Sequence, residues 1–140
     1  TFFIKKLIKK YMKILQEDYD LAKARLVQIK QDLRDLAEEF NIVLNQSSET
    51  WHDNAPWDDA KGRERVLLVE QETLQKILIE ARVVEVTAKS LIGNKHKVSF
   101  NGSETKIFLA GNFTMRMGQK VDGYTIVSLE SPIAQSLLVE

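Results

Sequence analysis

The strongest constraint on the fold is a regular apolar seam in the first third of the chain. Apolar residues recur there at alternating intervals of four and three positions, which is the pattern of a coiled coil. The seam consists of Ile8, Met12, Leu15, Tyr19, Ala22, Leu26, Ile29, Leu33, Leu36, Phe40 and Val43. The residues between them, Asp18 and Arg25 included, are mostly charged or amide-bearing, so we expect them to face solvent. A helix of this kind must bury its seam against a partner.

A second helix is predicted from about residue 57 to about residue 84. Pro56 suits the first turn of a helix, and the acidic residues that follow it favour the positive end of the helix dipole. Its seam is less regular, because Arg63 and Glu70 fall in the apolar register. The apolar members of this seam are Ala60, Leu67, Leu74, Ile77, Ala81 and Val84. Two such helices joined by a short loop are expected to form an antiparallel hairpin.

The periodicity changes after residue 84. Short segments rich in β-branched and aromatic residues predict strands at 84–90, 97–100, 105–110 and 124–129. Between them lie the turn-forming pairs Gly93-Asn94, Asn101-Gly102, Gly111-Asn112 and Asp122-Gly123. Ser131 and Pro132 then predict a brief helix, with serine as the cap and proline at the first helical position.

These patterns predict an α+β protein with two parts. Residues 1–84 form an antiparallel coiled-coil hairpin with an acidic tip at about 48–59, and residues 85–140 form a small β-rich domain. A domain of this size has little core. We therefore expect further strands beyond the end of the sequence, and the start without methionine favours a piece cut from a longer protein.

Composition narrows the function classes. The 20 basic and 20 acidic residues balance, so no general attraction to nucleic acid or membrane is expected. The absence of cysteine excludes disulfides, thiolate catalysis and cysteine-based zinc sites, and fits a reducing cytosol. No apolar run approaches the roughly 20 residues that span a bilayer. We expect a cytoplasmic protein without a membrane partner.

The stretch Ser48–Ala60, which reads SETWHDNAPWDDA, contains more chemistry than a turn requires. It has four acidic residues, two tryptophans and a proline, and it lacks lysine and arginine. One interpretation is structural: Asp58 and Asp59 stabilise the helix dipole, while Trp51 and Trp57 staple the two helix ends together. The other interpretation is functional and follows from a resemblance.

Several stretches together resemble the bacterial Gre transcript cleavage factors. The resemblance extends from about Glu49 to Leu138 and is most specific at the tip and at Ser131-Pro132-Ile133-Ala134. The stretches are Asp53-Asn54-Ala55 followed by Trp57, then Ala81-Arg82-Val83-Val84-Glu85-Val86, Lys97-Val98-Ser99-Phe100-Asn101-Gly102, and Tyr124 to Leu138.

This resemblance implies a partner and a mode of action. A carboxy-terminal domain similar to the FKBP fold would bind bacterial RNA polymerase at the rim of its secondary channel, and the hairpin would pass down that channel. Tip carboxylates would help to hold a catalytic Mg²⁺ ion, so that the polymerase cleaves the 3′ end of a backtracked RNA. The factor would not be an enzyme itself, because it would only supply ligands to the polymerase active site.

The resemblance also implies roles for individual residues. Asp53 and Glu49 would be the catalytic residues and the metal ligands. The remaining tip residues would be Thr50, Trp51, Asn54, Ala55 and Trp57. Ser131, Pro132 and Ile133 would belong to the polymerase-binding domain.

Other functions stay open beside transcript cleavage. The family tip reads approximately Gly-Asp-Leu-Lys-Glu-Asn-Ala-Glu-Tyr, and an ungapped match places Thr50 at the first acid and Asp53 at the second. A Gre-like paralogue that inhibits transcription is therefore an alternative. A coiled-coil scaffold or oligomerisation module is another, although the hairpin predicts a monomer.

The first 13 residues raise a separate hypothesis. They contain five lysines and no acidic residue, interleaved with apolar residues at helical spacing. Such a segment could bind a membrane surface or nucleic acid. We favour a third interpretation, in which Ile4, Leu7, Ile8, Tyr11 and Met12 pack against the β-rich domain while the lysines face water.

Overall fold

The computed structural model describes residues 11–46 and 55–139 and divides the chain into two compact units. One unit comprises residues 1–22 together with 77–140, and the other comprises residues 23–76. The base of the hairpin therefore belongs to the same unit as the β-rich region.

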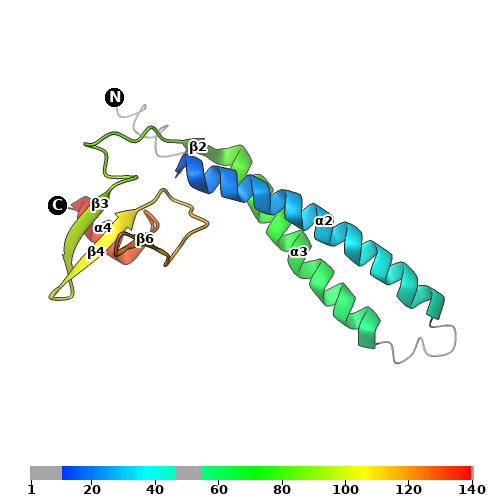
Figure 1. Cartoon of the computed structure of the whole chain (residues 1–140). Coiled ribbons are helices and arrows are strands. Elements are labelled where there is room, and N and C mark those ends of the chain that lie inside the picture. Colours follow the sequence, from blue (N-terminus) through cyan, green and yellow to red (C-terminus); the bar gives the residue numbers. More distant parts are fainter. Residues whose placement is uncertain (1–10, 47–54, 140) are drawn as a thin grey trace. The chain divides into compact units, whose positions relative to one another are not determined.

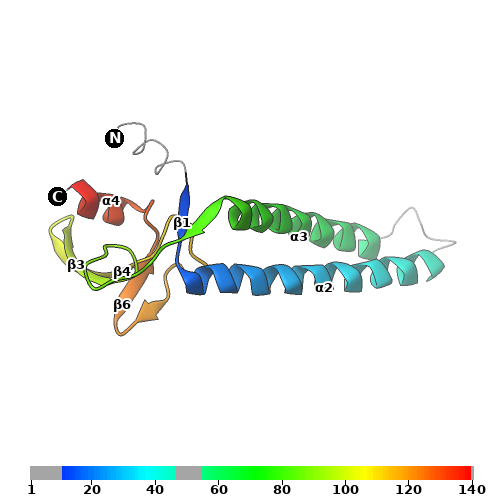
Figure 2. The same ribbon diagram turned by 90° about the horizontal axis from the view of Figure 1, so that it is seen from above.

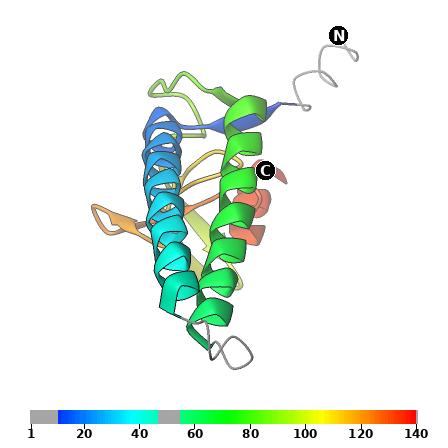
Figure 3. The same cartoon turned by 90° about the vertical axis from the view of Figure 1, so that its right-hand side faces the viewer.

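Two long antiparallel helices form the hairpin. Helix α2 covers Gln16–Gln46 and helix α3 covers Ala55–Glu80, and the two lie side by side (Figures 1 and 3). The apolar seam of the first helix is buried or half-buried from Tyr19 to Val43. The predicted α+β fold, a helical hairpin followed by a small β-rich domain, is confirmed.

Both helices are shorter at the base of the hairpin than the seam predicted. Met12–Ile14 forms strand β1, which leads into α2 (Figure 2), and Ala81–Val83 forms strand β2. These two strands pair in parallel. The prediction that Met12 and Ala81 continue the helices is therefore wrong. Their apolar side chains are still buried or half-buried there, in a cluster with Ile14 and Ile77. Hydrogen bonds between the two strands satisfy the backbone groups in place of helical hydrogen bonds.

A four-stranded sheet forms the centre of the β-rich domain, in the order β3-β4-β6-β5. Its strands are β3 (Lys95–Phe100), β4 (Ser103–Leu109), β5 (Lys120–Val121) and β6 (Tyr124–Val127). The predicted strands near 97–100, 105–110 and 124–129 are thus present, while the short β5 was not predicted. The strand predicted at 84–90 is wrong: that segment is a loop, in which the Asn94 side-chain amide donates to the carbonyls of Thr87 and Ser90.

Two tight turns set the register of this sheet. Asn101-Gly102 joins β3 to β4 with φ values of 51° and 78°, and Asp122-Gly123 joins β5 to β6 with 50° and 83°. Positive φ at both central residues is what a two-residue hairpin of the I′ type requires, and Asn-Gly and Asp-Gly supply it at least cost.

Helix α4 (Pro132–Val139) contacts β3 and begins as predicted (Figure 1). The Ser131 hydroxyl accepts a hydrogen bond from the Ala134 amide at 3.3 Å, which is the geometry of a helix cap. Ala134 is fully buried.

Candidate functional site

Most of the predicted tip lies outside the described residues. Glu49, Thr50, Trp51, Asp53 and Asn54 all fall in the segment 47–54. Ala55 is the exposed first residue of α3, and Trp57 is half-buried in its first turn. The candidate site is therefore built from the ends of the two helices that lead into and out of this segment.

An aromatic cluster joins these two helix ends. The Trp57 ring lies edge-on to Phe40, with ring centroids 4.8 Å apart and planes inclined by 62°. Leu36, Phe40 and Ala60 are buried in the same cluster. The Lys61 ammonium lies 4.7 Å from the centroid of Phe40 and 5.2 Å from that of Trp57. Trp57 thus makes the stapling contact of the structural interpretation.

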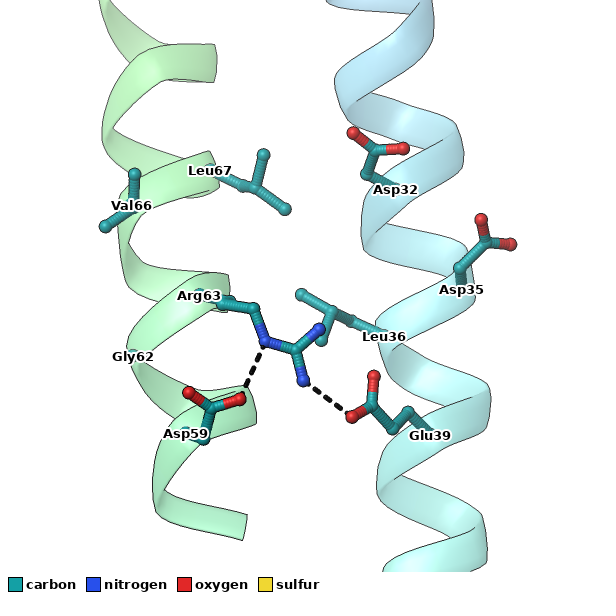
Figure 4. Close-up of a pocket in the computed structure, with 9 residues that line it drawn as sticks. All are labelled: Asp32, Asp35, Leu36, Glu39, Asp59, Gly62, Arg63, Val66 and Leu67. Atoms are coloured by element: carbon teal, nitrogen blue, oxygen red, sulfur yellow. Dashed lines mark hydrogen bonds and ion pairs between the residues drawn. The ribbon is translucent and has the colours of Figure 1, made fainter. Parts of the chain in front are cut away.

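Arg63 connects two carboxylates next to this cluster. Its Nη2 lies 2.6 Å from Glu39 Oε1 on the facing helix, and its Nε lies 3.1 Å from Asp59 Oδ2 on its own helix (Figure 4). Hydrogen bonding to Glu39, aided by the charges of Glu39 and Asp59, raises the pKa of Arg63 above its ordinary value. Asp59 is therefore paired with a cation in the hairpin itself.

An open groove of about 640 Å³ lies along the same part of the hairpin (Figure 4). Leu36, Val66 and Leu67 contribute apolar surface. Its other lining residues are Asp32, Asp35, Glu39, Asp59, Gly62 and Arg63. Four carboxylates against one guanidinium give the groove a net negative charge.

A second ion pair explains the irregular seam of α3. Arg25 Nε lies 2.7 Å from Glu70 Oε2, and Arg25 Nη2 lies 2.8 Å from Glu70 Oε1, so the contact between the helices is bidentate. Hydrogen bonding from Arg25 holds the pKa of Glu70 below its ordinary value, and the charge of Arg25 acts in the same direction. The two polar residues in the seam, Arg63 and Glu70, are thus each paired with a charged residue of α2.

At the base of the hairpin, Asp18 is a buried carboxylate that the sequence interpretation placed in solvent. Its side chain is fully buried, and Oδ1 accepts hydrogen bonds from Thr114 Oγ1 at 2.9 Å, the Met115 amide at 3.1 Å and Arg116 Nε at 3.0 Å. Oδ2 accepts from Arg116 Nη2 at 3.2 Å. Hydrogen bonding to Asp18 raises the pKa of Arg116. The prediction of a solvent-facing Asp18 is wrong because its partners lie almost 100 positions away in the sequence.

Backbone contacts attach β1 to the same region. The Lys13 carbonyl accepts from the Asn112 amide at 2.7 Å, and the Lys13 amide donates to Asn112 Oδ1 at 2.8 Å. A side chain at Gly111 has no room, because its Cβ would lie 2.1 Å from the Lys13 carbonyl oxygen. The predicted turn Gly111-Asn112 is therefore a close contact with β1, and the start of α2 is fixed to the β-rich domain.

The three residues that the resemblance would place in a polymerase-binding domain lie together at the start of α4. Pro132 is exposed, while Ser131 and Ile133 are half-buried. The Ser131 hydroxyl also donates to the Ser128 carbonyl at 2.9 Å. Ser131 is therefore engaged in the helix cap, and Pro132 is the most accessible of the three.

The described residues do not form a metal site by themselves: in 11–46 and 55–139, no group of three or more His, Cys, Asp or Glu side chains is arranged to hold an ion. The chemistry of Glu49 and Asp53 fits Mg²⁺, which takes one or two carboxylates together with water and phosphate oxygens. Across the described helices, none is long and apolar enough to cross a membrane.

Comparisons with known proteins identify the fold. No family model and no curated protein sequence matches the chain. Among solved structures, the chain is similar to the GreA factor homolog 1 (Gfh1) protein of Thermus thermophilus, with a TM-score of 0.51 and 17% identity over 91% of this chain and 82% of that one. It is similarly related to Thermus aquaticus Gfh1, with a TM-score of 0.51 and 15% identity over 90% and 81%. The Gre-like resemblance is thus confirmed at the level of the fold.

Proposed function

We propose that this chain is a transcription elongation factor that binds bacterial RNA polymerase. The β-rich domain would bind at the rim of the secondary channel, and the hairpin would enter the channel and act on backtracked complexes near the RNA 3′ end. The observation that carries this proposal is the Gre-like fold, which occurs together with a Gre-like tip motif in the segment that joins α2 to α3. The factor would work as a monomer in the cytoplasm.

Under this proposal, Asp53 and Glu49 would hold Mg²⁺ jointly with the polymerase. When bound, the ion would activate a water molecule and stabilise the oxygens that attack and leave the phosphodiester. The factor would contribute hard oxygen ligands to that ion and would not be an enzyme on its own. The Trp57 and Phe40 contact would support the tip by holding the two helix ends together.

An inhibitor without cleavage activity is the second candidate function, and two observations favour it. Thr50 stands where the family has its first acid, and a neutral hydroxyl is a weaker ligand for Mg²⁺ than a carboxylate. Asp59, a neighbouring acid outside the family motif, is paired with Arg63 and is therefore a poor substitute. Such a factor would occupy the channel and slow elongation.

A transcript cleavage assay on purified, backtracked bacterial elongation complexes tests these proposals. The wild-type protein is compared with Asp53→Ala, Glu49→Ala and the control Asp58→Ala, a change of an exposed acid in the first turn of α3. Binding to the polymerase is measured in parallel. Cleavage that is lost in the Asp53 or Glu49 variant but kept in the control supports the metal-ligand role.

The other outcomes separate the alternatives. Binding with intact RNA and slower elongation supports the inhibitor. If the protein does not bind the polymerase, both proposed functions are contradicted, and the coiled-coil scaffold is the remaining alternative.

A further inference from the structure

One face of the four-stranded sheet carries exposed lysines around a tyrosine. Lys97 of β3 pairs directly with Lys106 of β4, so both side chains lie on the same face. Phe108 pairs with Ile126 in the parallel register of β4 and β6, which places Lys106 and Tyr124, two residues earlier, on that face as well. Lys95, two residues before Lys97, completes the set. We call Lys95, Lys97, Lys106 and Tyr124 the basic face.

Two of the three lysines of the basic face lie close to the aromatic ring. Lys95 Nζ is 5.5 Å and Lys106 Nζ is 5.7 Å from the centroid of Tyr124. All three lysines are exposed and Tyr124 is half-buried. These contacts place two positive charges beside a half-buried aromatic ring on a sheet surface.

Packing does not account for these lysines. The opposite face of β3 and β4 carries the buried Val98 and Ile107. At one end of the lysine-bearing face, Ile126 is buried in a cluster with Leu15 and Ala110, against which Phe108 packs. The residues of the basic face do not belong to this cluster. The fold therefore does not require lysine at these positions.

The charge arrangement is unfavourable for the fold alone. Like charges directly opposite on neighbouring strands destabilise a sheet, and Lys97 and Lys106 form such a pair. In the described part of the chain, neither lysine forms an ion pair, whereas Lys95 Nζ lies 2.7 Å from Asp122 Oδ2. A polyanion that contacts both lysines would remove this repulsion.

We propose that the basic face binds single-stranded nucleic acid, with phosphates on Lys97 and Lys106 and a base on Tyr124. Proteins that bind single strands combine a positively charged path with aromatic rings on which bases stack, often on a sheet surface. A ring between lysines favours this ligand over an acidic peptide, since a carboxylate gains little from the aromatic surface. The inference goes beyond the proposed function and does not depend on it.

Fluorescence anisotropy with labelled oligo(dT) and oligo(U) 12-mers tests this proposal. The intact chain is compared with the double variant Lys97→Ala/Lys106→Ala and the matched control Lys30→Ala/Lys89→Ala, which removes the same charge at exposed positions elsewhere. Tyr124→Leu removes the ring, and Tyr124→Phe keeps it. Glu104→Gln removes an acid from the same face of β4, two residues from Lys106.

We expect the affinity for single strands to fall about 7- to 18-fold between 50 and 200 mM salt, as for two or three neutralised phosphates. The Lys97/Lys106 variant should bind about tenfold more weakly than the control and with a shallower salt dependence. Tyr124→Leu should lose about fivefold or more, while Tyr124→Phe should bind like the wild type. Glu104→Gln should bind more tightly. Circular dichroism should show the wild-type fold for each variant, since the substituted lysines do not pack in the core.

Two results would overturn the proposal. In one, the double variant binds as well as the control, as it would if the lysine-rich first 13 residues carried the binding. In the other, polyglutamate competes with the oligonucleotides at equal charge concentration and Tyr124→Leu has no effect, which would identify an acidic protein segment as the ligand.

Discussion

At the scale of single residues, Asp18 connects the hairpin to the β-rich domain. It accepts bonds from the 114–116 segment through both carboxylate oxygens, and it is fully buried. Removing one partner of a buried ion pair leaves the other charge without compensation, which costs several kcal/mol. No local sequence signal identifies this residue, because an acid in the first turn of a helix is usually explained by the helix dipole.

Asp18→Ala should therefore lower the free energy of unfolding by about 3 kcal/mol. Urea denaturation followed by circular dichroism measures this as a lower midpoint with an unchanged m-value. Asp20→Ala is the matched control: Asp20 is exposed on the same helix and accepts one hydrogen bond from Gln16, so its loss should cost under about 0.5 kcal/mol. Equal effects of the two substitutions would contradict the role given to Asp18.

Alanine substitutions at two glycine positions should change the stability of the protein in opposite directions. Gly111→Ala places a Cβ against the Lys13 carbonyl oxygen and should cost about 3 kcal/mol, since backbone must move to make room. Gly62 lies inside α3, and a Cβ there would meet nothing within 4 Å. Gly62→Ala should stabilise the protein by about 0.5–1 kcal/mol through its better helix propensity. Thermal unfolding of the two variants checks both signs, and stabilisation by Gly111→Ala would rule out the close contact with β1.

At the scale of secondary-structure elements, local patterns predicted those features whose cause is local. The seam predicted α2, the Asn101-Gly102 and Asp122-Gly123 pairs predicted tight turns, and Ser131-Pro132 predicted the start of α4. The predicted ends of the long helices at the base of the hairpin were wrong, because the apolar spacing continues through Met12 and Ala81, although these residues belong to β1 and β2. Pairing between two strands almost 70 residues apart overrides that spacing, and periodicity alone does not reveal it. The candidate tip was predicted by resemblance, whereas the pairing of Arg63 with Glu39 and of Glu70 with Arg25 depends on the facing helix, which the sequence pattern does not place.

The contact between α2 and α3 should depend on pH through Glu70. Its pKa is lower in the folded state than its ordinary value of 4.5, so the pair stabilises the fold above that pH and loses this contribution as the pH falls through the folded pKa. Both side chains are about one-third exposed, 34% for Arg25 and 36% for Glu70, so screening limits the contribution to about 0.5–1 kcal/mol.

Glu70→Gln should therefore destabilise the protein at pH 7, and its difference from the wild type should shrink at acidic pH. Urea midpoints measured at pH 7 and at about pH 3 give the two differences. Glu72→Gln, an exposed change on the same helix, should show no comparable pH-dependent difference. A Glu70→Gln effect that is as large at pH 3 as at pH 7 would mean that the ion pair is not its cause.

At the scale of the whole molecule, the buried seam favours a hairpin over an oligomerisation module. A scaffold that pairs through α2 would need Ala22, Ile29 and Leu36 on an open helix face, yet all three are buried within a single chain. Exposed apolar residues remain on the hairpin, among them Val27 at 68% and Val69 at 60%. They lie outside the seam, and single apolar residues at the surface are usual in soluble proteins.

The chain should therefore be a monomer, with a mass near 16.1 kDa by light scattering. The measured mass should stay constant over a tenfold range of protein concentration, because the seam is already buried against α3. Val27→Lys should leave both mass and stability unchanged, whereas Ile29→Lys would bury an unpaired charge in the hairpin and should unfold it. A mass near twice the monomer value that Val27→Lys returns to one chain would instead show that the outer face of α2 pairs between chains, and would favour the scaffold over a factor that enters a polymerase channel alone.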